Sequence, residues 1–198
     1  MLPASPFSRP PVHLYPPLEA GESEAIEKMM KNVPLMLETM TAYFLGEKRE
    51  SMLFIAAGAV ALAVAVGLFR SSSPYRGMMW PLALIALIQL GVGGSVYLRT
   101  DAQVAELSAL LKEDPAAFAK KEAPRMEKVL ASFTLYKWIE IALMATGVAL
   151  TFLYRGRDLP YSIGVGLLLQ SAFMLLFDLF AERRADVYIH QIKSLAGG

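Results

Sequence analysis

The sequence predicts an all-α integral membrane protein in which four transmembrane helices form an up-and-down bundle. Three observations predict this class. The 198 residues are 55% apolar and have a mean hydropathy of +0.42, which is too apolar for an ordinary soluble domain of this length. The apolar residues gather in four blocks, and most of the charged residues lie between the blocks. Three blocks contain at least 19 consecutive uncharged residues, enough to cross a bilayer core of about 30 Å as a helix.

The N-terminal region divides into two predicted parts. Residues 1–20 contain six prolines, which rule out the continuous apolar helix of a signal peptide, so we expect an extended, uncleaved tail. Residues 21–46 are predicted to form an amphipathic helix, because apolar residues recur at spacings of three and four from Ile26 to Phe44. Acidic and basic residues mix on its polar face, which favours packing against protein helices over attraction to an anionic lipid surface.

Four spans are predicted, at residues 51–69, 77–98, 133–154 and 159–180. The third is the weakest, because Lys137 and Glu140 lie in its first half. A re-entrant or surface helix is the alternative for this block, and it would leave an odd number of crossings.

The segments outside the spans are also predicted to be helical. Residues 99–132 are expected to form a helical hairpin that is broken at Asp114-Pro115, and residues 181–198 a helical extension with a narrow apolar stripe. With four crossings, all these segments emerge on the same side of the bilayer, where they can continue the bundle as a stalk.

The distribution of basic residues predicts the orientation. The stalk side carries fourteen Lys and Arg residues, whereas the two short turns on the opposite side carry four, namely Arg70, Arg76, Arg155 and Arg157. The larger number favours a cytoplasmic stalk in an inner or plasma membrane, with both termini inside. The density of bases in the short turns favours the inverse orientation, but that orientation would require translocation of a charged N-terminal segment of about fifty residues without a signal.

Composition also limits the chemistry. The net charge is +1 and no long Lys/Arg run occurs, so nucleic acid is not an expected partner. The chain has no cysteine and only two histidines, which excludes disulfides and thiolate metal sites and leaves no expected cofactor. No nucleophile elbow, phosphate loop or dinucleotide fingerprint occurs, so a non-enzymatic role is favoured.

A polar cluster inside the predicted spans is the first candidate site. Ionisable groups in a membrane are costly and therefore often functional. The cluster consists of Lys137, Glu140, Asp178, Gln170 and Gln89. Its members either form a structural ion pair, with Lys137 bound to Glu140 three residues away, or act as a proton or cation relay. The structural role is favoured, because a relay needs polar groups throughout the bilayer.

The second candidate is an acidic ridge after the fourth span. Asp178, Glu182, Asp186 and His190 recur at intervals of four, which aligns them on one helix face. Glu182, Asp186 and His190 form a possible metal site, but interleaved arginines favour a salt-bridged surface.

Two further sets of residues are candidates for helix packing and for partner binding. Small residues four apart, which let helices approach closely, are Ala57, Ala61, Ala65, Gly91 and Ser95, and a second row on the first span holds Ala59, Ala63 and Gly67. Thioether side chains that adapt to varied surfaces, or fill a core, are Met29, Met30, Met36 and Met40.

Three functions remain open from the sequence. The first is a non-enzymatic interaction protein, such as a scaffold, an accessory subunit or an immunity-type inhibitor. Its expected partners are membrane lipids and either another membrane protein or a second copy of the chain. The second is a small transporter or channel component that uses Lys137, Glu140 and Asp178. The third is a membrane enzyme or metal-binding protein that uses the acidic ridge.

Overall fold

The protein is built from four long helices. The structure, a computed structural model, describes the backbone of residues 20–196 and the side chains of residues 31–195. The elements are α1 (Ala20–Arg70), the short 3₁₀ helix η1 (Arg76–Met78), α2 (Met79–Glu113), α3 (Pro115–Leu153) and α4 (Asp158–Ala196). No strand occurs between residues 20 and 196, so the predicted all-helical class is confirmed. The predicted tail lies outside the described residues, except for Ala20.

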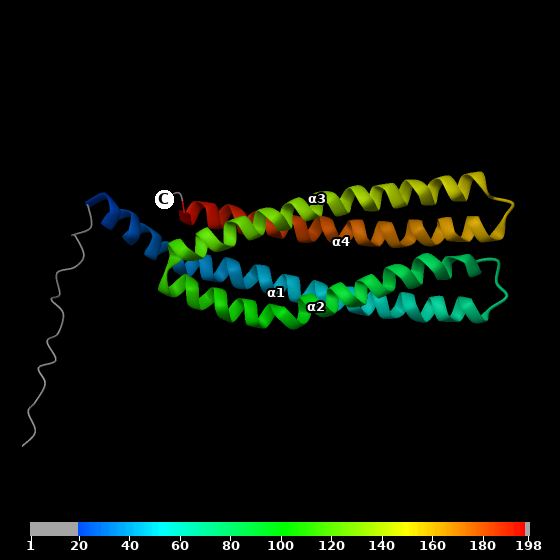
Figure 1. Ribbon diagram of the computed structural model, residues 1–198, viewed down its shortest axis with the longest axis horizontal. Coiled ribbons are helices and arrows are strands. Elements are labelled where there is room, and N and C mark those ends of the chain that lie inside the picture. Colours follow the sequence, from blue (N-terminus) through cyan, green and yellow to red (C-terminus); the bar gives the residue numbers. More distant parts are fainter. Residues whose placement is uncertain (1–19, 197–198) are drawn as a thin grey trace, which may run out of the picture.

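The helices are arranged as two antiparallel hairpins. Figure 1 shows α1 beside α2 and α3 beside α4, with the two hairpins side by side along the long axis. The turns within the hairpins lie at one end of the molecule, whereas the α2–α3 connection and the end of α4 lie at the other. α1 runs without interruption through both the predicted amphipathic segment and the first predicted span.

The connection between the hairpins forms where the sequence predicts a break. The Asp114 side chain caps α3 by accepting a hydrogen bond of 2.9 Å from the Ala117 N–H, and Pro115 occupies the first turn. Both features favour a helix start, because the first N–H groups of a helix have no partner within it. α3 then continues as one helix through Pro124.

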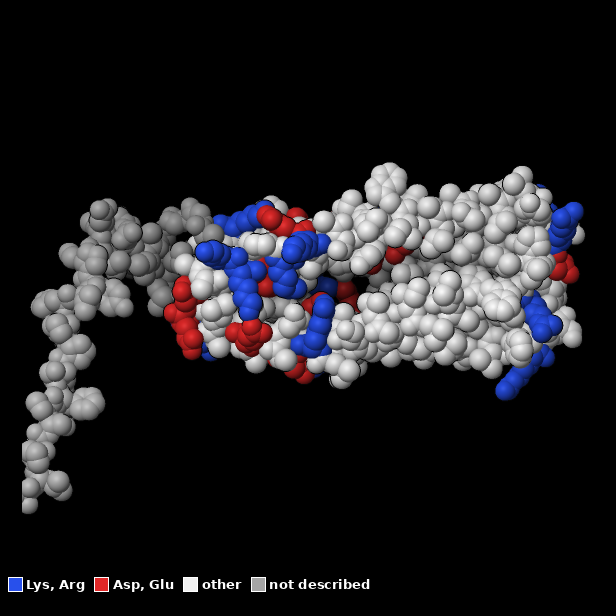
Figure 2. Space-filling view, viewed as in Figure 1, with Lys and Arg blue, Asp and Glu red and all other residues white. Residues whose placement is uncertain are grey.

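One half of the molecule along its long axis has an apolar surface, and the other half has a charged surface. The four helices are each long and apolar enough to span a membrane. The exposed large apolar side chains lie at residues 52–98 and 135–180, apart from Leu35, Leu45 and Val187. Figure 2 shows this half almost free of charge up to its tip, while charged side chains gather on the other half. We call the charged half, residues 31–50, 99–132 and 181–195, the stalk.

The stalk has an apolar core of its own. All four helices contribute buried side chains to it, namely Met36, Met40, Tyr43, Phe44, Leu107, Leu111, Phe118, Ala119, Met126, Ala185, Tyr188, Ile189, Ile192 and Leu195. The rings of Tyr43 and Tyr188 stack at 4.6 Å between centroids. This core joins the two hairpins at the stalk end.

Glycines set how closely the helices approach in the apolar half. A Cβ added at Gly164 of α4 would lie 2.8 Å from the Gly147 carbonyl oxygen of α3, so these helices cross in near backbone contact. A Cβ at Gly93 of α2 would lie 3.0 Å from the Ser51 carbonyl oxygen of α1. At the far end, a Cβ at Gly166 of α4 would lie 2.7 Å from Pro81 of α2, which joins the hairpins there.

Candidate functional site

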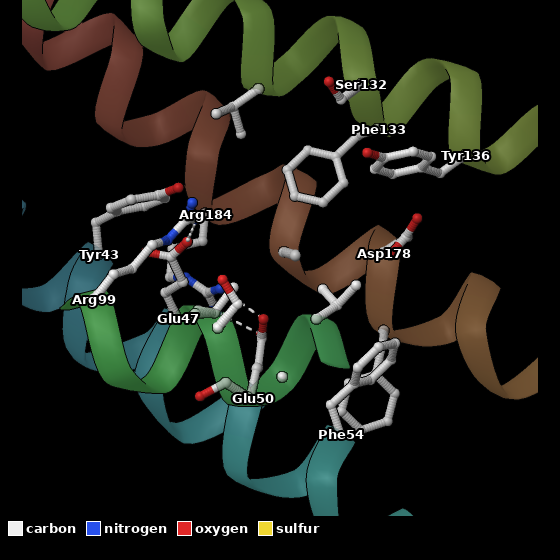
Figure 3. Close-up of a pocket in the computed structure, with 18 of the residues that line it drawn as sticks. Tyr43, Glu47, Glu50, Phe54, Arg99, Ser132, Phe133, Tyr136, Asp178 and Arg184 are labelled. Carbon is white, nitrogen blue, oxygen red and sulfur yellow. Dashed lines mark hydrogen bonds and ion pairs between the residues drawn. The ribbon is translucent and has the colours of Figure 1, made fainter. Parts of the chain in front are cut away.

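A cavity of about 560 Å³ lies between the hairpins, at the junction of the apolar half and the stalk. All four helices line it, between Tyr43 and Phe54 on α1, Gly91 and Arg99 on α2, Val129 and Tyr136 on α3, and Phe177 and Arg184 on α4. Figure 2 shows a hollow at this level with acidic side chains inside it, and Figure 3 shows the lining side chains.

Small side chains leave this space open. Gly91, Gly93 and Ser95 of α2 and Ala181 of α4 all line the cavity. A Cβ added at Gly91 would meet nothing within 4 Å, so the space beside this helix is empty of protein. Between the stalk core and the contact at the far end, the small residues leave space between the hairpins, which longer side chains such as Arg184 and Glu50 bridge.

Two arginines and three carboxylates lie in the cavity wall. The Arg184 guanidinium donates two hydrogen bonds, of 2.5 and 2.6 Å, to the two carboxylate oxygens of Glu50, which links α4 to α1 across the hairpins. Arg99 donates a longer bond of 3.4 Å to Glu47 within the first hairpin. Both arginines therefore already have anionic partners, and Asp178 is the remaining carboxylate.

The acidic groups of the wall are incompletely satisfied. Among the described residues, no hydrogen-bond donor reaches the buried Oδ2 atom of Asp178 or the buried Oε2 atom of Glu47. Burial raises the pKa of the Glu47 carboxyl above its ordinary value, although Arg99 and other arginines oppose the shift. Three carboxylates against two guanidinium groups leave the wall with a formal excess of one negative charge.

The structure brings together only part of the predicted polar cluster. Lys137 donates hydrogen bonds of 2.6 and 2.7 Å to Glu182 of α4, so its partner is not Glu140. Glu140 is only 2% exposed, and neither of its carboxylate oxygens has a hydrogen-bond partner in the described part of the chain. It lies close enough to Asp178 for the two groups to interact electrostatically. Glu140 and Asp178 thus form a buried acidic pair beside the cavity.

The two glutamines of the cluster lie apart from the cavity. Gln89 is fully buried, and both atoms of its amide lack a hydrogen-bond partner among the described residues. A Cβ at Gly58 of α1 would lie 3.1 Å from the Cβ of Gln89, so Gln89 sits where α1 and α2 pack together. Gln170 of α4 is also buried, with an unpartnered Nε2 atom. Neither residue lines the cavity.

The acidic ridge is engaged in contacts within the protein. Glu182 binds Lys137, and the exposed His190 lies 2.8 Å from the Asp186 carbonyl oxygen and 3.5 Å from its carboxylate. Among residues 31–195, no three His, Asp or Glu side chains gather closely enough to hold a metal ion. The geometry of the described residues therefore gives the ridge no metal-binding arrangement.

The candidate packing and partner residues separate into different environments. Met36 and Met40 are buried in the stalk core, where they are inaccessible to a partner while the stalk is intact, and the side chains of Met29 and Met30 lie outside the described part. Of the small residues, Ala65 is buried and Ala57 and Ala61 are half-buried on α1. Gly91 and Ser95 border the cavity instead of a neighbouring helix.

Sequence reasoning missed four charged residues that define the cavity, namely Glu47, Glu50, Arg99 and Arg184. A signal for them exists, because each lies within a few positions of the stalk end of a predicted span. It also missed a buried network in the stalk. Arg125 donates two bonds to the fully buried Glu122 at 2.6 and 2.7 Å, and the hydroxyl of Tyr188 donates a third at 3.0 Å.

No protein family, curated protein or solved structure matches this chain. The site must therefore be interpreted from its own geometry. An open cavity lined by carboxylates, two ion-paired arginines and aromatic rings is suited to binding a small molecule.

Proposed function

We propose that the chain is an integral membrane protein that crosses the bilayer four times and acts without catalysis, as an interaction protein for another membrane helix. The four spans are residues 51–69, 77–98, 133–154 and 159–180. The exposed apolar half supports this insertion, because an unbroken apolar surface of such size on a soluble monomer would aggregate. In a bilayer, lipid chains would cover this apolar surface and keep it away from water.

Aromatic residues at both ends of the apolar half support the same placement. Trp80 and Tyr154 lie exposed near the turn end, and Tyr97 and Trp138 lie exposed near the stalk end. Trp and Tyr are enriched at the two interfaces of a bilayer, so these positions match a slab of membrane thickness. At the turn end, arginines also lie over aromatic rings, as Arg155 does over Phe152 at 4.9 Å.

The proposed orientation places the stalk and both termini in the cytoplasm. The fourteen basic residues on the stalk side, against four in the turns, support it. The ion pairs of the described residues all lie in the stalk or at its junction with the apolar half. Such a charged region is costly to translocate.

One observation carries the proposed interaction with another helix. Ala59, Ala63 and Gly67 are all exposed on α1 in the apolar half, four residues apart on one face. A Cβ added at Gly67 would meet nothing within 4 Å, so no described part of the chain packs against this glycine. Small residues at this spacing let a second transmembrane helix approach to backbone contact. The partner is either another membrane protein or a second copy of this chain.

Cross-linking tests the proposal. The chain has no cysteine, so an introduced cysteine is the only thiol in the protein that can react. Ala63→Cys, oxidised in native membranes, is expected to form a disulfide-linked dimer or, when a bifunctional thiol–amine reagent is used, to capture one stoichiometric partner. Ala63→Leu should abolish the association, whereas the matched change Ala172→Leu, at an exposed position of α4, should not. If Ala63→Leu associates as the unchanged chain does, the row is not an interface.

Transport is a second candidate, and the buried pair Glu140–Asp178 beside the cavity favours it. Unpartnered carboxyl groups at this depth are suited to exchanging a proton or a cation. Glu140→Gln should abolish proton- or cation-driven flux in reconstituted vesicles. Unchanged flux would remove the pair from any transport role.

A further inference from the structure

We propose that the cavity between the hairpins binds an amphipathic organic cation, a molecule with a positively charged nitrogen or phosphorus centre on an apolar body. This inference goes beyond the proposed interaction with another helix. Its test is binding in detergent, which needs neither a partner nor a membrane.

The size of the cavity fits a small molecule. Its volume of about 560 Å³ falls within the range of roughly 300 to 1,000 Å³ that is common for ligand pockets. A bare metal ion would leave most of this space empty. An added Cβ at Gly91 meets nothing, so the space extends to the backbone of α2.

The charges of the wall select a cation. Arg184 is neutralised by two short bonds from its own guanidinium to Glu50, and Arg99 faces Glu47. The Nε atom of Arg184 has no hydrogen-bond partner among the described residues, but the charge of this guanidinium is already shared with Glu50. By contrast, Asp178 and Glu47 each have a buried oxygen that lacks a donor in the described chain, and a cation would compensate both.

Glu140 adds to the negative charge behind Asp178, although it does not line the cavity itself. Its carboxyl group is almost completely buried, and no donor among the described residues reaches either oxygen. It lies in electrostatic range of Asp178, which lines the cavity. Lys137 lies in electrostatic range of Asp178 but is hydrogen-bonded to Glu182, so a positive charge in front of Asp178 would stabilise the two buried acids further.

The remainder of the wall fits an apolar body. Phe54 and Phe177 lie 6.0 Å apart between ring centroids at the end of the cavity toward the apolar half, and Phe133 and Tyr136 line its α3 side. Figure 3 shows the rings of Phe54, Phe133 and Tyr136 around the cavity together with Asp178. Aromatic faces attract cations and also pack against apolar groups. A ligand would thus place its charge toward the carboxylates and its body toward the phenylalanines.

The test is equilibrium binding of tetraphenylphosphonium to the purified full-length protein in a non-ionic detergent. Tetraphenylborate, which has the same shape and the opposite charge, is the matched probe for selectivity. Saturable binding of one phosphonium per cavity is expected, with binding of the borate weaker by at least about tenfold, which corresponds to about 1.4 kcal/mol. Equal or tighter binding of the borate would overturn the inference, as would an absence of saturable phosphonium binding.

Two variants test whether binding occurs in this cavity. Asp178→Asn removes a charge from the wall, and Gly91→Leu fills the space without changing any charge. Each should weaken phosphonium binding by at least about tenfold. The control for Asp178→Asn is Asp101→Asn, on the exposed stalk surface. The control for Gly91→Leu is Gly94→Leu, because an added Cβ at Gly94 also meets nothing within 4 Å but Gly94 does not line the cavity. Both controls should bind within about twofold of the unchanged chain.

The elution profile and the thermal unfolding of each variant establish whether it is folded. If Asp178→Asn does not fold, Gly91→Leu still tests the location of the site. Binding that persists undiminished in a folded Gly91→Leu protein would place the probe on the apolar belt and overturn the inference.

Discussion

The pair Arg184–Glu50 is expected to hold the two hairpins together at the cavity. The two side chains are 24% and 23% exposed, so water screens them only in part. Their two short parallel bonds join charged groups, each worth about 1.5–3 kcal/mol when formed without strain. The cost of removing both charges from water offsets part of this gain. We expect a coupling free energy of about 1–3 kcal/mol.

A double-mutant cycle measures this coupling. Arg184→Ala, Glu50→Ala and the double variant are unfolded at equilibrium in detergent, and the free energies of unfolding are compared. The control is the same cycle on Lys193 and Glu127, which pair at 2.9 Å with side chains 55% and 56% exposed. This exposed pair should couple by less than about 1 kcal/mol. A coupling at Arg184–Glu50 no larger than in the control would refute the reasoning.

Gly46 provides an independent check on the same contact. The Arg184 side chain crosses α1 over this glycine, and an added Cβ would lie 2.7 Å from the Arg184 Cδ atom. Gly46→Ala, made as the only substitution, should therefore displace the Arg184 guanidinium and lower the free energy of unfolding. In the Arg184→Ala background the same change should stabilise by up to about 1 kcal/mol, because alanine is the better helix former.

Three further predictions concern stability in detergent. Glu122→Ala should lower the free energy of unfolding by about 3–5 kcal/mol, because it leaves the arginine and tyrosine that bind this buried carboxylate without a partner; a loss below about 1 kcal/mol would contradict the network. Glu47→Gln should raise the melting temperature at pH 8. Burial raises the pKa of the Glu47 carboxyl in the folded state, so the folded protein loses stability as the pH rises and this carboxyl ionises, and glutamine does not ionise. The gain should vanish near pH 4, below the ordinary carboxyl value of 4.5, and equal effects at both pH values would contradict it. Gly164→Val should cost about 1–3 kcal/mol by forcing the helix away from Gly147, whereas Gly156→Val in the open turn should be nearly neutral; equal costs would contradict the close crossing.

Four long apolar helices could be predicted from the sequence alone. Charge-free stretches long enough for a bilayer mark the apolar parts, and the Asp114-Pro115 pair marks the connection between the hairpins, where the structure has a helix cap. These features are local, because a proline or a run of apolar residues acts on its own segment.

Contacts between helices were beyond sequence reasoning. Spacing along one helix pairs Lys137 with Glu140, but the structure pairs Lys137 with Glu182 of the next helix. The lysine prefers a carboxylate that remains near solvent, whereas Glu140 faces the interior. Periodicity gives the face on which a residue lies, but it does not identify the helix that this face meets.

The cavity was hidden for the same reason. Gly91 and Ser95 match the spacing of a close helix contact, yet they border empty space. The glycines that do bring helices together include Gly147 and Gly164, which lie on different helices and have no common spacing. Where two hairpins separate depends on the sum of many side-chain volumes along both of them.

Cysteine accessibility in intact cells tests the proposed four-span topology most directly. The chain has no cysteine of its own, so single cysteines can be placed at Ser72, in the turn after α1, and at Lys112, in the stalk, both of which are exposed. With a membrane-impermeant maleimide, we expect Ser72→Cys to be labelled in intact cells and Lys112→Cys to be labelled only after permeabilisation. Labelling of both positions without permeabilisation, or of Lys112→Cys alone, would contradict the proposed four-span topology with a cytoplasmic stalk.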